Sequence, residues 1–170
     1  DPAAWNPLTG EIDYNKSGYP LIEIVTEPDF KSSEEVISWL RQLIATLKYM
    51  KIIDKNLGIK ADVNVNLVGK NKKTERVEVK NISSVENIGK AIDYELERQS
   101  EEGSVRETRR FDAEKGKTMV MRVKEGAEDY RFIPDPDLPG VDISKIDVKA
   151  IKKSLPESPD EKLEKFMKGK

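Results

Sequence analysis

The chain has 170 residues, which is long enough for one domain with a hydrophobic core. Charged residues make up 36% of it, but the formal net charge is only −2, so no overall electrostatic field demands a nucleic-acid or anionic membrane partner. It contains neither cysteine nor histidine, which excludes disulfides, thiolate or imidazole metal ligands, cysteine nucleophiles and histidine acid–base catalysis within these residues. Carboxylates, amides, hydroxyls, lysine and arginine remain for chemistry, and oxygen ligands of this kind suit magnesium better than zinc.

The first predicted element is a strand that follows an irregular stretch. Residues 1–18 hold two prolines and a tryptophan without a clear hydrophobic period, and we interpret them as a truncated N-terminal segment. Residues 21–25, Leu-Ile-Glu-Ile-Val, lie between Gly-Tyr-Pro and Glu-Pro-Asp, which predicts a short strand centred on Glu23. Because a carboxylate buried without a partner costs on the order of several kcal/mol, we expect Glu23 to face water, a cation or a metal ion.

Two amphipathic helices and a hairpin come next. Each helix is predicted from an N-terminal capping signal followed by apolar residues spaced three and four apart. The first begins at 32–35 (SSEE) and ends near Lys51, and the second begins at 83–86 (SSVE) and ends near Gln99. Residues 61–67 and 76–80 alternate in polarity around a lysine-rich loop at 69–73, which indicates a β-hairpin. This order predicts an α+β fold: an antiparallel sheet with helices on one face and the other face open.

The polar side of this hairpin is the main functional signal in the residues themselves. Asp62, Asn64 and Asn66 point to one face of the first strand, whereas the apolar residues between them point to the other. Three short, oxygen-bearing side chains are poor strand formers and are unusual on an ordinary wet face. We interpret this face, which Glu23 can share with Asp62, as the hydrophilic floor of a catalytic site.

A second hairpin is predicted from residues 105–111 and 118–123, which carry Arg106, Arg109, Arg110 and Arg122. The Gly-Lys-Thr at 116–118 is not a phosphate-binding P-loop, because the first glycine of that motif would fall on Phe111 and no strand-to-helix junction is present. Prolines at 134–139 then prevent further regular pairing.

The chain carries a series of longer strings that are specific when taken together: YPLIEIVTEPD (19–29), ADVN (61–64), RVEVKN (76–81), IDYELERQ (92–99), ETRRFD (107–112), MRVKE (121–125) and DYRFIPDPD (129–137). In this order they resemble the B subunits of the aspartyl/glutamyl-tRNA amidotransferases, the GatB family. The resemblance implies that residues 19–140 are the second half of a catalytic, or cradle, domain. Its fold would be that of glutamine synthetase and the guanidino kinases, with one strand-helix-hairpin-helix repeat and a hairpin extension. Residues 141–170 would be a linker and the start of a helical domain. The Glu-x-His element of the family's first half is missing here, so this piece alone is expected to be inactive.

The resemblance also implies a reaction. In the family, ATP activates the carboxyl group of Glu on tRNA(Gln) or Asp on tRNA(Asn) as an acyl phosphate, and ammonia derived from glutamine displaces the phosphate. ATP and Mg²⁺ are therefore implied, and the implied partners are the amidase (A) subunit, the small (C) subunit, and aminoacyl-tRNA. No apolar run reaches the roughly 20 residues of a membrane span and no signal peptide precedes the first strand, so a cytoplasmic protein without a membrane partner is expected.

By the same motif match, Glu23 and Asp62 fall on metal-ligand positions of the family. We take both residues, together with Lys80, as catalytic candidates. Our further hypothesis places Asn64 in the same shell as the metal ion and assigns Lys80 and the three arginines to contacts with the phosphate or the tRNA. The substrate-binding candidates are therefore Asn64, Arg109, Arg110 and Arg122.

Plainer interpretations of the same residues remain open. Glu23 can be a strand carboxylate paired with a lysine or arginine, and Lys80 a cross-strand partner of Glu23 or Asp62. Half of the arginines can be solvated surface. At the level of function, the alternatives are a non-catalytic module that binds tRNA or another protein of the enzyme, and a free-standing phosphotransferase with its own small substrate.

Overall fold

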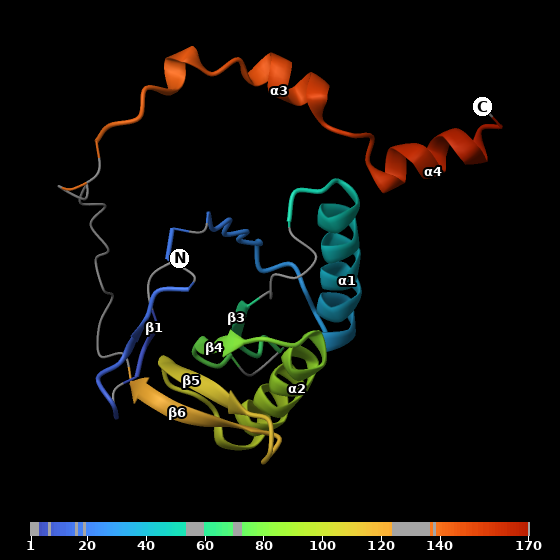
Figure 1. The fold of residues 1–170 in the computed structure, drawn as a ribbon. Helices are drawn as coiled ribbons and strands as arrows, with labels where there is room; N and C mark the ends of the chain where they lie inside the picture. The colour runs from blue at the N-terminus through green and yellow to red at the C-terminus, as the bar shows by residue number, and fades with distance from the viewer. Residues whose placement is uncertain are drawn as a thin grey trace.

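The computed structural model describes residues 4–6, 8–15, 17–18, 20–53, 60–69, 73–123, 137 and 139–169. Its main body is an α+β unit with a four-stranded sheet in the order β3-β4-β5-β6 (Figure 1). In chain order the elements of this body are α1 (Ser33–Tyr49), β3 (Ala61–Val65), β4 (Val77–Ile82), α2 (Val85–Glu102), β5 (Glu107–Asp112) and β6 (Lys117–Val123). A small two-stranded pairing precedes it and short helices follow it: β1 (Ala4–Trp5), β2 (Ile12–Asp13), the 3-10 helix η1 (Ile143–Lys145), α3 (Val148–Ser154) and α4 (Pro159–Met167).

Both long helices form where the capping signals predict them. The hydroxyl of Ser32 accepts a hydrogen bond from the backbone N–H of Glu35 at the start of α1, and Ser84, one residue into the predicted signal, does the same for Asn87 at the start of α2. These bonds satisfy backbone donors that a helix N-terminus leaves without partners. Gly103, with φ of +76°, ends α2, in a backbone conformation that glycine adopts without steric cost.

The sheet is mixed, and the prediction of an antiparallel sheet is therefore wrong. The hairpin pairs β3 and β4 antiparallel, and β5 and β6 also pair antiparallel, but β4 and β5 run parallel. The 18-residue helix α2 connects β4 to β5. A connection of this length carries the chain back to the end of the sheet where β4 began, so that the next strand runs in the same direction.

The predicted strand at 21–25 is also absent. The structure gives these residues no regular secondary structure, and Glu23 is exposed there. The apolar side chains are exposed as well, with 75% of Leu21 and 81% of Val25 accessible. A strand is stabilised by paired neighbours and a covered face, and no strand of the described residues pairs with this segment (Figure 1).

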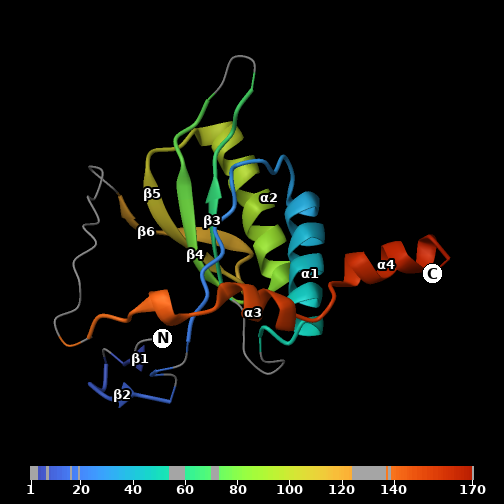
Figure 2. The same ribbon diagram turned by 90° about the horizontal axis from the view of Figure 1, so that it is seen from above.

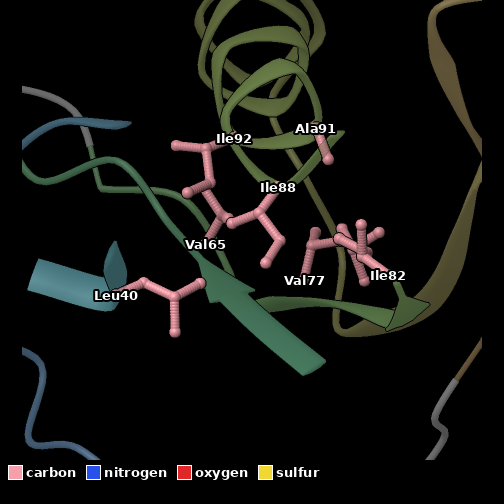
Figure 3. Packing of buried hydrophobic residues seen from close by; sticks show 8 residues of the cluster. Leu40, Val65, Val77, Ile82, Ile88, Ala91 and Ile92 are labelled. Atoms are coloured by element: carbon pink, nitrogen blue, oxygen red, sulfur yellow. The ribbon is translucent and has the colours of Figure 1, made fainter. Parts of the chain in front are cut away.

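The hydrophobic core lies between the sheet and the two long helices, which lie side by side (Figure 2). Val77 and Val79 of β4 are fully buried and belong to one hydrophobic cluster with Ile88 and Ile92 of α2 and Leu40 of α1. Figure 3 shows Val77 of this cluster below the two isoleucines of α2. The helices thus cover one face of the sheet. Within the described part of the chain, no helix has the length and apolar character needed to cross a membrane.

Candidate functional site on the open face of the sheet

The alternation of β3 and β4 sorts their side chains as the sequence predicts. Val65 and Val79 are buried in the core, whereas Asp62 and Asn64 of β3 are exposed on the opposite, helix-free face. Glu78 stands opposite Asn64 in the strand register. The predicted polar face therefore exists, and it carries Asp62, Asn64, Glu78 and Lys80.

An ion-paired cluster forms the centre of this face. The ammonium nitrogen of Lys80 lies 3.2 Å from Oδ2 of Asp62 and 3.0 Å from Oε1 of Glu78. The other oxygen of Asp62 accepts a hydrogen bond of 2.9 Å from the backbone N–H of Asn81. The hydrogen bond to Glu78, together with the bond and charge attraction from Asp62, raises the pKa of Lys80 above its ordinary value. The cross-strand pairing of Lys80 with Asp62, one of the two roles predicted for this lysine, is thus confirmed.

The polar face continues onto β5. Arg110 stands beside Lys80 in the parallel register and is exposed. Thr108 stands beside Glu78, and its hydroxyl donates a hydrogen bond of 3.4 Å to that carboxylate. Two cationic side chains, Lys80 and Arg110, therefore occupy neighbouring positions on the open face, next to the two carboxylates that pair with Lys80.

Arg109 points the other way, into the layer between the sheet and α2. It is 8% exposed, and its guanidinium contacts Glu95 at 3.2 Å and Glu107 at 2.8 Å and donates to the backbone carbonyl of Thr118 at 3.0 Å. Each of the three guanidinium nitrogens of Arg109 thus already donates a hydrogen bond to a neighbour, which favours a structural role over the predicted contact with substrate. Arg122 of β6 pairs through its backbone with Thr108 of β5, but the side chain of Arg122 lies outside the part of the chain that the structure describes.

Arg109 belongs to a buried polar network that sequence reasoning missed. Glu95 of α2 is fully buried and binds Arg98 at 2.8 Å in addition to Arg109. Gln99, one turn later, is also fully buried and donates to Glu95 at 3.0 Å and to the backbone carbonyl of Val65 at 3.2 Å. The spacing of these residues could have revealed their burial, because Glu95 and Gln99 continue the buried stripe of Ile88 and Ile92 at intervals of three and four residues.

The network makes the stability of the domain sensitive to acid. Burial by itself would raise the pKa of Glu95, but the hydrogen bonds from Arg98, Gln99 and Thr118 outweigh burial and hold that pKa below its ordinary value of 4.5. A depressed pKa in the folded state means that the carboxylate stabilises the fold above about pH 4.5, and that this contribution is lost as the pH falls through the lower, folded-state pKa. We therefore expect melting temperatures measured from pH 7 to pH 3 to fall less steeply for Glu95→Gln than for the wild type. Parallel curves would contradict this assignment.

The described residues do not by themselves form the predicted magnesium site. Glu23 lies in the irregular segment, and no contact of the described part joins it to Asp62, both of whose oxygens are already engaged by Lys80 and Asn81. Three or more acidic side chains gathered around one point would suit a divalent ion, but no such group occurs among the described residues.

Comparison with known proteins places the chain in a family. Residues 6–149 match the model of the GatB/GatE catalytic domain. The B subunits of several aspartyl/glutamyl-tRNA(Asn/Gln) amidotransferases are similar to it. The protein from Methanopyrus kandleri is 47% identical, and the match covers 85% of this chain and 32% of that protein. The protein from Methanocaldococcus jannaschii is 44% identical, and the match covers 98% of this chain and 36% of that protein. The protein from Clostridium beijerinckii is 45% identical, and the match covers 92% of this chain and 35% of that protein. The chain thus spans about a third of the length of these relatives. Because the family model matches most of its residues and these relatives are similar over most of its length, the chain belongs to the GatB/GatE catalytic-domain family.

Proposed function

We propose that this chain is part of an enzyme that converts Glu-tRNA(Gln) or Asp-tRNA(Asn) into Gln-tRNA(Gln) or Asn-tRNA(Asn). ATP would activate the aminoacyl carboxylate as an acyl phosphate, and ammonia would then displace the phosphate. The observation that carries the proposal is the open polar face in a member of this family, where the ammonium of Lys80 is held between Asp62 and Glu78 and Arg110 stands beside it.

The chemistry of this face suits phosphoryl transfer. The transferred phosphoryl group carries its charge on peripheral oxygens, and catalysis consists mainly of positioning and electrostatic stabilisation by cations. In the proposal, Lys80 and Arg110 contact the phosphate, and Asn64 donates or accepts a hydrogen bond at the edge of the same site. Neither histidine nor cysteine is needed for these roles.

Magnesium stays a proposal for the larger protein. Glu23 and Asp62 are the residues of this chain that would contribute ligands, but the described residues do not assemble them around one point. We therefore assign no catalytic step to the ion. The glutamine synthetase-like repeat, the division at 18–19 and 140–141, the partnership with an amidase and a small third protein, and a cytoplasmic location are proposals of the same kind.

The direct test of the proposal is Lys80→Met in the full-length protein assembled with its partners. Removing the ammonium should lower the rate of ATP-dependent amidation of Glu-tRNA(Gln) or Asp-tRNA(Asn) by about 10²-fold or more, which is the usual effect of removing one preorganised group that stabilises transition-state charge. Lys90→Met is the matched control, because Lys90 lies on the surface of α2 and pairs only with Glu86 among the contacts described. Wild-type rates for Lys80→Met would refute the role of this lysine.

A second candidate is a non-catalytic module that binds tRNA or another protein of the enzyme. The observation in its favour is that the two predicted metal ligands, Glu23 and Asp62, are not in contact in the part of the chain that the structure describes. Under this alternative, Glu23→Ala and Asp62→Ala would leave amidation intact. Loss of amidation in both variants, with binding of tRNA and of the partner proteins retained, would exclude it.

A further inference from the structure

The backbone of β4 departs from a regular strand at Asn81. Its φ is +58°, and among the described residues it shares a positive φ outside glycine only with Lys51. Asparagine adopts this left-handed conformation more readily than most residues, but the conformation is rare within a strand, and Asn81 is the penultimate residue of β4. Asn81 lies directly beside the ion-paired cluster of the open face, because its backbone N–H donates a hydrogen bond to Asp62.

The register of the hairpin shows what this departure does. Ala61 pairs with Ile82 and Val63 pairs with Val79, so that Asp62 alone stands opposite both Lys80 and Asn81. Two residues against one is a β-bulge, a feature that redirects a side chain and occurs preferentially next to functional sites. Because of this bulge, Asp62 accepts the Asn81 N–H at 2.9 Å with one oxygen and the Lys80 ammonium at 3.2 Å with the other.

Glu78 holds the same ammonium from the other side. Its Oε1 lies 3.0 Å from Nζ of Lys80, and Oε2 accepts a hydrogen bond from Thr108 on β5. Lysine has a long side chain with many rotamers, so an unrestrained ammonium would occupy a wide volume. Two carboxylates, each fixed by a further hydrogen bond, restrict it to one place on the open face.

We propose that Asn81 and Glu78 are positioning residues for Lys80. The left-handed backbone of Asn81 fixes Asp62, and Asp62 and Glu78 together hold the Lys80 ammonium where it meets the phosphate. This inference rests on the proposed function, in which Lys80 contacts the phosphate. Neither Asn81 nor Glu78 touches substrate in this arrangement, and both act through the lysine.

The role of Asn81 is tested by two substitutions at that position in the full-length, assembled enzyme. Asn81→Gly keeps the left-handed backbone without steric cost, and we expect it to retain kcat within about threefold of the wild type. Asn81→Val disfavours this backbone, because a β-branched residue rarely adopts positive φ, and displacement of a reacting group by even 1 Å can lower the rate by about 10²-fold. We expect a loss of this order in kcat for Asn81→Val.

Lys51 provides the control for backbone strain. Its φ is +56°, close to that of Asn81, but it follows α1 and lies outside the open face. Lys51→Val should lower the melting temperature about as much as Asn81→Val does while leaving kcat and KM unchanged. If Asn81→Val lowers only the melting temperature, its role is structural and the inference is overturned.

The role of Glu78 is tested by a double-mutant cycle with Lys80. Glu78→Gln retains the shape of the side chain and an oxygen for Thr108 but removes the charge that holds the ammonium. We expect it to lower kcat about tenfold in the wild-type background, with no change in KM for aminoacyl-tRNA, and to have no further effect in a Lys80→Met background, because groups that act as a unit are not additive. Equal effects of Glu78→Gln in the two backgrounds would overturn the inference.

Crystal structures of the Asn81→Val and Glu78→Gln proteins separate failure of this inference from failure of the proposed function. Normal amidation by Lys80→Met would refute the catalytic role of Lys80, and displacement of its ammonium in both variants would then show only that Asn81 and Glu78 fix the conformation of this lysine. An undisplaced ammonium and normal kcat in both variants, combined with an inactive Lys80→Met, would refute positioning and leave the proposed function intact.

Discussion

Replacing Glu95 with alanine is expected to lower the free energy of unfolding by about 3–5 kcal/mol, the usual cost of removing one partner from a buried ion pair. Glu95 is fully buried on α2, and its carboxylate forms ion pairs with the guanidinium groups of Arg98 and Arg109. Alanine would leave a cavity and would remove one of the two carboxylates that Arg98 and Arg109 share, so that Glu107 alone would balance both cations there, and Gln99 would lose an acceptor. Most of the loss arises from the charges left behind rather than from the strength of the original pair.

Chemical denaturation of the wild type and the variant measures this change. Glu97→Ala is the matched control, because Glu97 lies on the exposed side of the same helix and a surface substitution there should change stability by no more than about 0.5 kcal/mol. If Glu95→Ala and Glu97→Ala destabilise the domain equally, the buried network does not hold α2 to the sheet.

Ile88→Ala is expected to lower the free energy of unfolding by about 2–5 kcal/mol, the range observed when a large aliphatic side chain is removed from a core. Ile88 is 2% exposed and packs between α2 and the valines of the sheet (Figure 3). The loss combines the transfer energy of the missing methyl groups with a cavity that the rigid strands cannot close.

The same substitution at Ile151 is the control for this prediction. Ile151 lies on α3 and is 52% exposed, so Ile151→Ala should be nearly neutral in the same denaturation experiment. A cost for Ile88→Ala below about 1 kcal/mol would mean that the space around Ile88 collapses on truncation, and that the core described between α2 and the sheet is not tightly packed.

The sequence alone determined the parts of this protein that depend on neighbouring residues. The serines that cap α1 and α2, the three-and-four spacing of their apolar residues and the alternation of β3 and β4 are local patterns, and each produced the predicted element. The same alternation correctly placed Asp62 and Asn64 on the open face of the hairpin.

The tertiary structure decided everything that depends on a partner far along the chain. The parallel pairing of β4 with β5 follows from the crossover through α2, and residues 21–25 form no strand where no described neighbour pairs with them. Alternation puts Arg109 and Arg110 on opposite faces of their strand but does not say which face the helices cover; in the structure Arg109 is buried against Glu95 and Arg110 is exposed beside Lys80. Local patterns set the period of a helix or strand, but burial and strand pairing arise only when distant segments meet. These contacts decide whether a charged side chain is buried in a structural ion pair or is exposed and accessible to a substrate.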